Sequence, residues 1–233
     1  MDWTRHFRPA ATVSLIALGT LTLTQAAHAA EAPWTGYDIS GKPCTGVKAS
    51  FGPYDYTQAY LHEHELFLVE SAHFNNKVET LTSGAKQKYN LLGDIHYTLK
   101  AWPNHHRALN TVIKYRFLKG PYKNLGIKQP ECYFQRALKF SPKDDVTHML
   151  YGIYLHKIDH LDEAKAQYEK AKSLNPNNLQ TLYNLGLLSL DLGDIDAAQD
   201  YADQVYKKNF PLKGLQRRIK ESEAAATPEA PKE

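Results

Sequence analysis

Histidines and carboxylates gather between residues 62 and 106, where together they could hold a metal ion. The densest set is His62, His64, Glu65, Glu70, His73, His96, His105 and His106. Glu70 and His73 have the Glu-x-x-His spacing that places both groups on one face of a helix, as in helical di-iron sites. Such a site needs a second pair of this kind, and the sequence holds none. Glu70, His73, His105 and His106 are therefore weak metal candidates, and we expect half-buried or surface histidines and no cofactor.

Other catalytic patterns give even less support to an enzyme. His156 and His160 are four residues apart and could share one divalent ion, but two ligands make a weak site. The sequence has no Gly-x-Ser-x-Gly nucleophile turn and no glycine-rich phosphate-binding loop. We therefore expect no catalytic residues and a protein that is not an enzyme. A metal-binding or catalytic protein centred on the His-rich segment 62–106 stays open as the alternative.

The only two cysteines are Cys44 and Cys132. Their wide separation does not fit a redox or zinc motif, which needs Cys-x-x-Cys or several ligands close together. In an oxidising compartment an isolated pair of cysteines usually forms a disulfide. We expect Cys44 and Cys132 to be bonded to each other, the alternative being two small buried hydrophobic residues.

Several residue types recur at intervals of 34 residues in the C-terminal half of the chain, and helices must position them. The recurring positions are Gly152, Ala164, Tyr168, Ala171 and Pro176, with Phe134, Ala137 and Pro142 one period earlier and Gly186, Ala198 and Ala202 one period later. A fixed period of this length indicates stacked helix-turn-helix units, each unable to bury its apolar face alone. The sequence therefore predicts an all-α repeat array.

This pattern resembles the tetratricopeptide repeat. The resemblance implies a short right-handed superhelix in which small residues sit where the two helices of a unit cross and proline closes the second helix. Gly152 and Ala164 match the crossing, Tyr168 matches an aromatic wedge between units, and Pro176 matches the stop. Arrays of this family usually bind other proteins, so the resemblance implies a protein or peptide partner.

The family's concave binding face comes from set positions on the first helix of each unit. Carried onto this sequence, these positions are Val146, Met149, Ile153, His156 and Lys157, then Gln180, Tyr183, Leu187, Leu190 and Asp191, with Asn184 beside Tyr183. Each of them could instead pack against a neighbouring helix. Some family members hold a peptide's terminal carboxylate with basic and asparagine side chains, and here only Asn184 matches. Exposed Met149 and Tyr183 would favour an amphipathic helix or an extended peptide.

The remaining segments surround this array. Glycine and proline over residues 30–56 predict an extended arm, and helical spacing of apolar residues predicts helices over 57–82, broken near Asn75. A short helix opening at Gly93 and ending at Pro103 follows, and then another from His105 to about Leu118. Residues 30–104 thus form an N-terminal arm and helical segment, and 105–225 form the array with a C-terminal capping helix. A loop at 119–130 is inserted into the first unit, and residues 226–233 form a tail that we expect to be disordered.

The N-terminus has the pattern of a secretory signal. Arg5 and Arg8 precede an apolar stretch over residues 10–23, and Ala27-His28-Ala29 offers a small-x-small cleavage site. The stretch is too short to span a bilayer, which needs about 20 residues. We therefore expect a signal peptide over residues 1–29, cleavage near Ala29, no integral membrane span, and a periplasmic or secreted protein.

Charge and composition narrow the class of partner. The formal net charge of the chain is only +3, which is too small to predict nucleic-acid binding. We expect a periplasmic adaptor or assembly factor that holds a protein partner in an envelope process such as secretion, pilus assembly or cell-wall synthesis. The sequence gives no indication of the partner's identity or of the oligomeric state.

Overall fold

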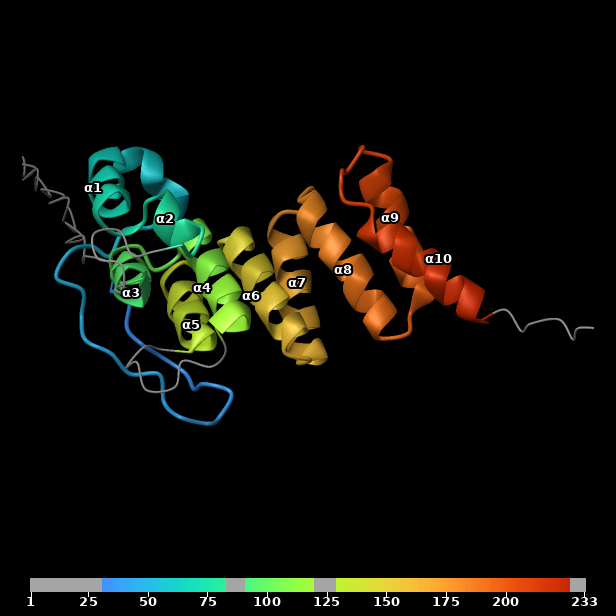
Figure 1. Cartoon of the computed structure of the whole chain (residues 1–233), viewed down its shortest axis with the longest axis horizontal. Helices are drawn as coiled ribbons and strands as arrows, with labels where there is room; N and C mark the ends of the chain where they lie inside the picture. Colours follow the sequence, from blue (N-terminus) through green and yellow to red (C-terminus); the bar gives the residue numbers. More distant parts are fainter. Residues whose placement is uncertain (1–30, 83–90, 120–128, 227–233) are drawn as a thin grey trace, which may run out of the picture.

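The computed structural model describes residues 31–82, 91–119 and 129–226. Helices follow one another in an elongated row, with α3 and α5 near one end and α10 at the other (Figure 1). Among the described residues every regular element is a helix, apart from one isolated bridge between Tyr37 and Pro43. The all-α prediction is therefore confirmed. No helix in the described ranges is long and apolar enough to cross a membrane.

Two helix pairs form the most regular part of the row. They are α6 (Asp145–Lys157) with α7 (Leu161–Leu174), and α8 (Leu179–Asp191) with α9 (Ile195–Tyr206). Asp144, Asn178 and Asp194 cap α6, α8 and α9 through side-chain oxygens that accept backbone N–H groups of the first turn. Pro176 lies in the turn after α7, where it cannot continue the helix. The predicted units 145–178 and 179–212 match these two pairs.

Small residues allow the helices of a unit to pack closely, as the resemblance implies. Gly152 on α6 lies against the ring of Tyr168 on α7, and a Cβ built at Gly152 would stand 2.5 Å from Tyr168 Cδ1. Only a residue without a side chain fits there. Tyr168 is 1% exposed, and Ala164 and Ala171 are fully buried beside it. Tyr168 therefore occupies the buried wedge position expected of it.

An earlier, less regular pair precedes these units. It consists of α4 (His106–Lys119) and α5 (Pro130–Phe140), which pack against each other and against α6. Phe134 and Ala137 are fully buried on α5, and the ring of Phe134 stacks on Tyr151 of α6 at 5.0 Å. The expected insertion at 119–130 falls mostly on residues 120–128, which lie outside the described ranges.

The last helix, α10 (Gly214–Ala226), packs against α8 and α9. Leu215 and Ile219 are buried there with Val205 of α9, so α10 covers the apolar face that the last unit would otherwise expose. This confirms the predicted capping helix. Leu212, just before the helix, is exposed.

The N-terminal segment lies over the other end of the row. An arm without helix covers residues 31–55, and a 3-10 helix η1 (Tyr56–Leu61), α1 (Glu63–His73), α2 (Asn76–Glu79) and α3 (Leu91–Ala101) follow it. Asn75 caps α2, so the predicted break at this asparagine is confirmed. The arm crosses below α3 and α5 in Figure 1.

Hydrogen bonds join this segment to the first regular unit. Asn104 donates from Nδ2 to Asp55 of the arm at 2.7 Å and to Asp144 at 2.8 Å. His106 Nε2 lies 2.8 Å from Asp144 Oδ2, and Thr147 donates its backbone N–H to Asp144 Oδ1. Asp144 therefore both caps α6 and links the segment before α4 to the array.

Candidate functional site

A hollow of about 480 Å³ opens between α6, α8 and α10, and we call it the groove hollow. It combines half-buried apolar side chains with charged ones at its rim. The residues around it are Ile153, His156, Lys157, Asp159, Leu161, Tyr168, Asn184, Leu187, Asp191 and Arg218. They come from the first helices α6 and α8, from the α6–α7 connection, from α7 (Leu161 and Tyr168) and from the cap α10. Such a surface can hold a chain segment carrying an apolar side chain.

Ion pairs hold the rim of the groove hollow. Asp191 at the end of α8 accepts hydrogen bonds from Arg218 of α10 at 2.5 Å, and its Oδ2 lies 2.8 Å from His156 Nε2 of α6. The hydrogen bond from Arg218 lowers the pKa of the Asp191 carboxyl, the hydrogen bond from His156 adds to this, and partial burial opposes it. Asp191 is thus ionised at neutral pH and joins three helices of the site.

Asn184 provides a buried polar group beside this rim. Its Oδ1 accepts a hydrogen bond from Gln180 Nε2 at 3.1 Å, whereas its Nδ2 is buried and has no hydrogen-bond partner in the structure. A buried amide without a partner costs about 1–3 kcal/mol relative to a satisfied one. A bound group that offers an oxygen acceptor to Asn184 would recover this free energy.

The structure brings together six of the eleven residues that the repeat register placed on the concave face. Ile153, His156, Lys157, Asn184, Leu187 and Asp191 all line the groove hollow. The other five do not line it. Val146 packs against the hydrophobic core around Tyr154 and Tyr168, which we call the first hydrophobic core, and Leu190 packs against a second core around Val205 and Leu215. Gln180 bonds Asn184, and Met149 and Tyr183 are buried.

Burial of Met149 and Tyr183 corrects one expectation. These side chains are 8% and 7% exposed, so they are not the surface anchors that the sequence suggested. Met149 belongs to the first hydrophobic core, and the ring of Tyr183 lies 5.1 Å from that of Phe210. Tyr183 is covered because α10 and the turn before it fold back over the end of the array. Met149 is covered because α6 also packs against α4 and α5. Repeat positions alone indicate neither contact.

Arg218 is the main site residue that the concave register missed. In the sequence it reads as part of the solvated face of a capping helix. One further step of 34 residues from Asn184, however, arrives at Arg218, and α10 lies beside α8 much as α8 lies beside α6. Extending the 34-residue period into the capping helix would therefore have identified Arg218 as a site residue.

The three histidines among the weak metal candidates each contact a different carboxylate, and Glu70 is the partner of His105. His105 is fully buried, with Nε2 3.0 Å from Glu70 Oε1, and Arg107 also bonds Glu70. Burial lowers the pKa of His105, although Glu70 opposes this. His73 lies 2.9 Å from Asp94, and His106 bonds Asp144. Within the described ranges, no three His, Cys, Asp or Glu side chains are grouped as metal ligands.

The two cysteines meet as expected. Cys44 of the arm and Cys132 of α5 have Cα atoms 5.4 Å apart, and their sulfur atoms lie at disulfide-bonding distance. Both residues are buried. The pair joins the arm to α5, the second helix of the less regular pair, and neither cysteine lines the groove hollow.

Comparison with known families identifies the regular part of the row. A family model described as tetratricopeptide repeat matches residues 147–178 and 179–207. These stretches coincide with α6 and α7 and with α8 and α9. No curated protein matches the chain.

Proposed function

Since this chain is a tetratricopeptide repeat protein, we propose that it acts as a binding module that holds a segment of a protein partner in the groove hollow. The observation that carries the proposal is the convergence there of six register-derived residues, one of which, Asn184, has a buried amide nitrogen without a partner. Chemistry on a substrate is not part of this function.

The lining favours a particular kind of segment. Ile153 and Leu187 are half-buried and offer contact to one apolar side chain. Asn184 offers an amide N–H to a backbone carbonyl next to that side chain. Lys157 and the pair of Asp191 with Arg218 at the rim favour a polar or mixed-charge flank and not an apolar one. An extended peptide with a single buried apolar side chain matches the apolar contact, the amide N–H and the charged rim.

The compartment and the process are further parts of the proposal. The signal-like residues 1–29 lie outside the described ranges, so their support comes from the sequence alone. The Cys44–Cys132 pair agrees with an oxidising compartment. Together they favour a periplasmic or secreted adaptor or assembly factor in an envelope process such as secretion, pilus assembly or cell-wall synthesis, with no role in binding nucleic acid.

Site-specific photocrosslinking in cells tests the proposed surface and does not require the partner to be identified first. A photoreactive phenylalanine analogue would replace Lys157 or Leu187 in the groove hollow. Matched controls would carry it at Lys165 on α7 or Gln199 on α9, both exposed and outside the hollow. We expect a discrete adduct of higher mass from the groove positions only.

A second variant checks that the adduct depends on the groove. Arg218→Ala removes a rim contact on an exposed face of α10, so the fold should persist, as circular dichroism would verify. It should weaken the adduct formed at position 157. Equal adducts from the control positions, or none from either groove position, would place partner binding elsewhere on the chain.

A further inference from the structure

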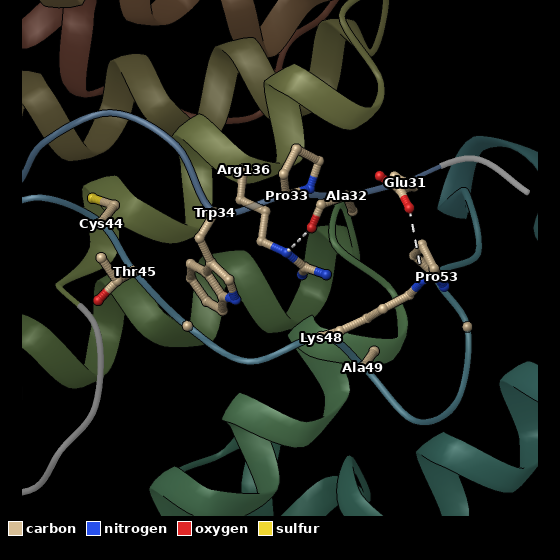
Figure 2. A pocket seen from close by; sticks show the side chains of 12 residues that line it. Glu31, Ala32, Pro33, Trp34, Cys44, Thr45, Lys48, Ala49, Pro53 and Arg136 are labelled. Carbon is tan, nitrogen blue, oxygen red and sulfur yellow. Dashed lines mark hydrogen bonds and ion pairs between the residues drawn. The ribbon is translucent and has the colours of Figure 1, made fainter.

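A second hollow, of about 600 Å³, lies at the opposite end of the row and is unrelated to the repeat register. Two limbs of the arm, residues 31–34 and 44–53, enclose it together with Arg136 of α5, and we call it the arm cavity. Figure 2 shows Arg136 reaching into the space between the two limbs. Its lining residues are Glu31, Ala32, Pro33, Trp34, Cys44, Thr45, Gly46, Lys48, Ala49, Gly52, Pro53 and Arg136.

Arg136 is a buried cation with only neutral partners among the described residues. It is 3% exposed, and its guanidinium donates to the backbone carbonyls of Ala32 at 2.8 Å, Leu99 at 2.5 Å and Lys100 at 3.1 Å. It also lies 5.0 Å from the ring centre of Trp34. A guanidinium carries five N–H groups, so these three bonds leave donor capacity unused.

The charge of Arg136 persists at neutral pH. Burial lowers the pKa of its guanidinium to about 10, which is still well above neutrality. The last carbonyls of α3 partly compensate the charge because the C-terminal end of a helix carries a partial negative charge. No carboxylate of the described residues pairs with it, so an anion entering the cavity would meet a cation that is only partly compensated.

A second cation stands at the mouth of the arm cavity. Lys48 Nζ lies 3.7 Å from Glu31 Oε1 across the two limbs, and the side chains are 80% and 76% exposed. Figure 2 shows this pair on one side of the opening. An exposed ion pair of this kind contributes little to stability, so its partners can readily be exchanged for others. Lys48 can therefore turn from Glu31 to a bound anion.

The walls of the cavity are held in place before any ligand binds. The Cys44–Cys132 pair joins one end of the returning limb to α5, and the backbone N–H of Tyr54 donates to Ala101 at the end of α3. Gly52 has a φ of +81°, and a Cβ there would collide with the carbonyl oxygen of Ala101. The limb can lie this close to α3 only because residue 52 is glycine.

We propose that the arm cavity is a binding site for a small organic carboxylate. The carboxylate would accept hydrogen bonds from the unused N–H groups of Arg136 and pair with Lys48 at the mouth. Its carbon body would lie against Pro33, Trp34 and Pro53. Planar guanidinium matches planar carboxylate in geometry, and the apolar walls favour an organic acid over inorganic phosphate.

Titration of the purified, oxidised protein with three probes tests this site. The probes are benzoate, its neutral isostere benzamide, and inorganic phosphate. The reporter is the indole N–H signal of Trp34 in ¹⁵N-resolved NMR, assigned with Trp34→Phe. We expect saturable shifts with benzoate at a Kd on the order of millimolar. Benzamide should bind about tenfold more weakly because it lacks the charge-assisted bonds, and phosphate should bind more weakly than benzoate.

Lys48→Ala is the informative variant because Lys48 is exposed and has no part in packing. It should weaken benzoate about threefold, as expected for loss of one exposed ion pair. Lys77→Ala on α2, an exposed lysine away from the cavity, should leave the affinity unchanged. Arg136→Gln should abolish benzoate binding. If that variant unfolds, the benzoate affinity of Lys48→Ala still tests the proposal.

Three results with benzoate and benzamide would overturn the assignment. They are equal affinity for benzoate and benzamide, benzoate binding that Lys48→Ala leaves unchanged, and no saturable shift of the Trp34 signal. Phosphate binding tighter than benzoate would likewise replace an organic-acid site with a general anion site and contradict the proposal.

Discussion

The close packing of Gly152 against Tyr168 leads to a prediction about stability, which two substitutions can test. Tyr168→Ala removes a side chain that is 1% exposed, and truncating a buried aromatic residue costs about 3–5 kcal/mol. For a domain of this size each kcal/mol lowers Tm by about 2–4 °C. The melting temperature of Tyr168→Ala should therefore fall by roughly 6–20 °C.

The effect of Gly152→Ala on the free energy of unfolding should change sign when the Tyr168 side chain is removed. A new Cβ would stand 2.5 Å and 2.6 Å from two ring carbons of Tyr168, and such overpacking costs about 1–3 kcal/mol. Replacing glycine by alanine inside a helix recovers about 0.5–1 kcal/mol. The single variant should thus be destabilised by about 1 kcal/mol. In the Tyr168→Ala background the collision disappears, and the same change should stabilise by about 1 kcal/mol.

The measurement is urea unfolding followed by far-UV circular dichroism, with free energies from linear extrapolation. The double-mutant cycle should give a coupling of about 1–3 kcal/mol, well above the ~0.5 kcal/mol scatter of independent sites. Ala166→Gly on the exposed face of α7 is the control, and it should cost about 1 kcal/mol in both backgrounds. Additive effects of Gly152→Ala and Tyr168→Ala would refute the close contact between α6 and α7.

Three further predictions follow from buried groups elsewhere. Intact-mass measurement with alkylation should find no free thiol at Cys44 or Cys132 in the unreduced protein, and reduction should cost about 4 kcal/mol because the bond closes a loop of 88 residues. Burial opposes ionisation of Asp144, but hydrogen bonds, first that from His106, outweigh it and hold its pKa below the ordinary value. The stabilisation from ionised Asp144 is therefore present above the ordinary pKa of about 4 and is lost as pH falls through the lower folded pKa. The difference in free energy of unfolding between wild type and Asp144→Asn should thus shrink in acid. A difference that stays constant with pH would contradict this. Tyr183→Ala should lower the free energy of unfolding by about 3–5 kcal/mol in the same assay, whereas an unchanged free energy of unfolding would mean that Tyr183 is an exposed groove residue.

Much of the architecture could be predicted because its causes are local. The 34-residue period follows from the need of each helix pair to bury the same face, so Ala164, Tyr168 and Ala198 are buried as the register required. Caps such as Asn75 and Asn178 act through the first turn of their own helices and can be read directly in the sequence.

The candidate site was predictable only in part because its shape depends on distant segments. Ile153, Asn184 and Leu187 follow from the register, but Arg218 enters the groove hollow only because the cap takes the place of a further first helix. The same docking buries Tyr183 against Phe210. Whether a concave position is open or covered depends on what packs beside it, and repeat position does not contain that information.

The sequence by itself determined the elements of this protein: an arm rich in glycine and proline, helices with a 34-residue period, and two cysteines with no partner but each other. Only the tertiary structure decided which polar groups meet. It assigned a carboxylate to each of His73, His105 and His106. Among the described residues it gave Arg136 backbone carbonyls and the Trp34 ring, but no carboxylate. Periodicity reflects interactions between neighbouring turns and units, whereas the arm reaches α5 across about 90 residues of chain. Contacts at that separation follow from chain geometry, which no local pattern encodes.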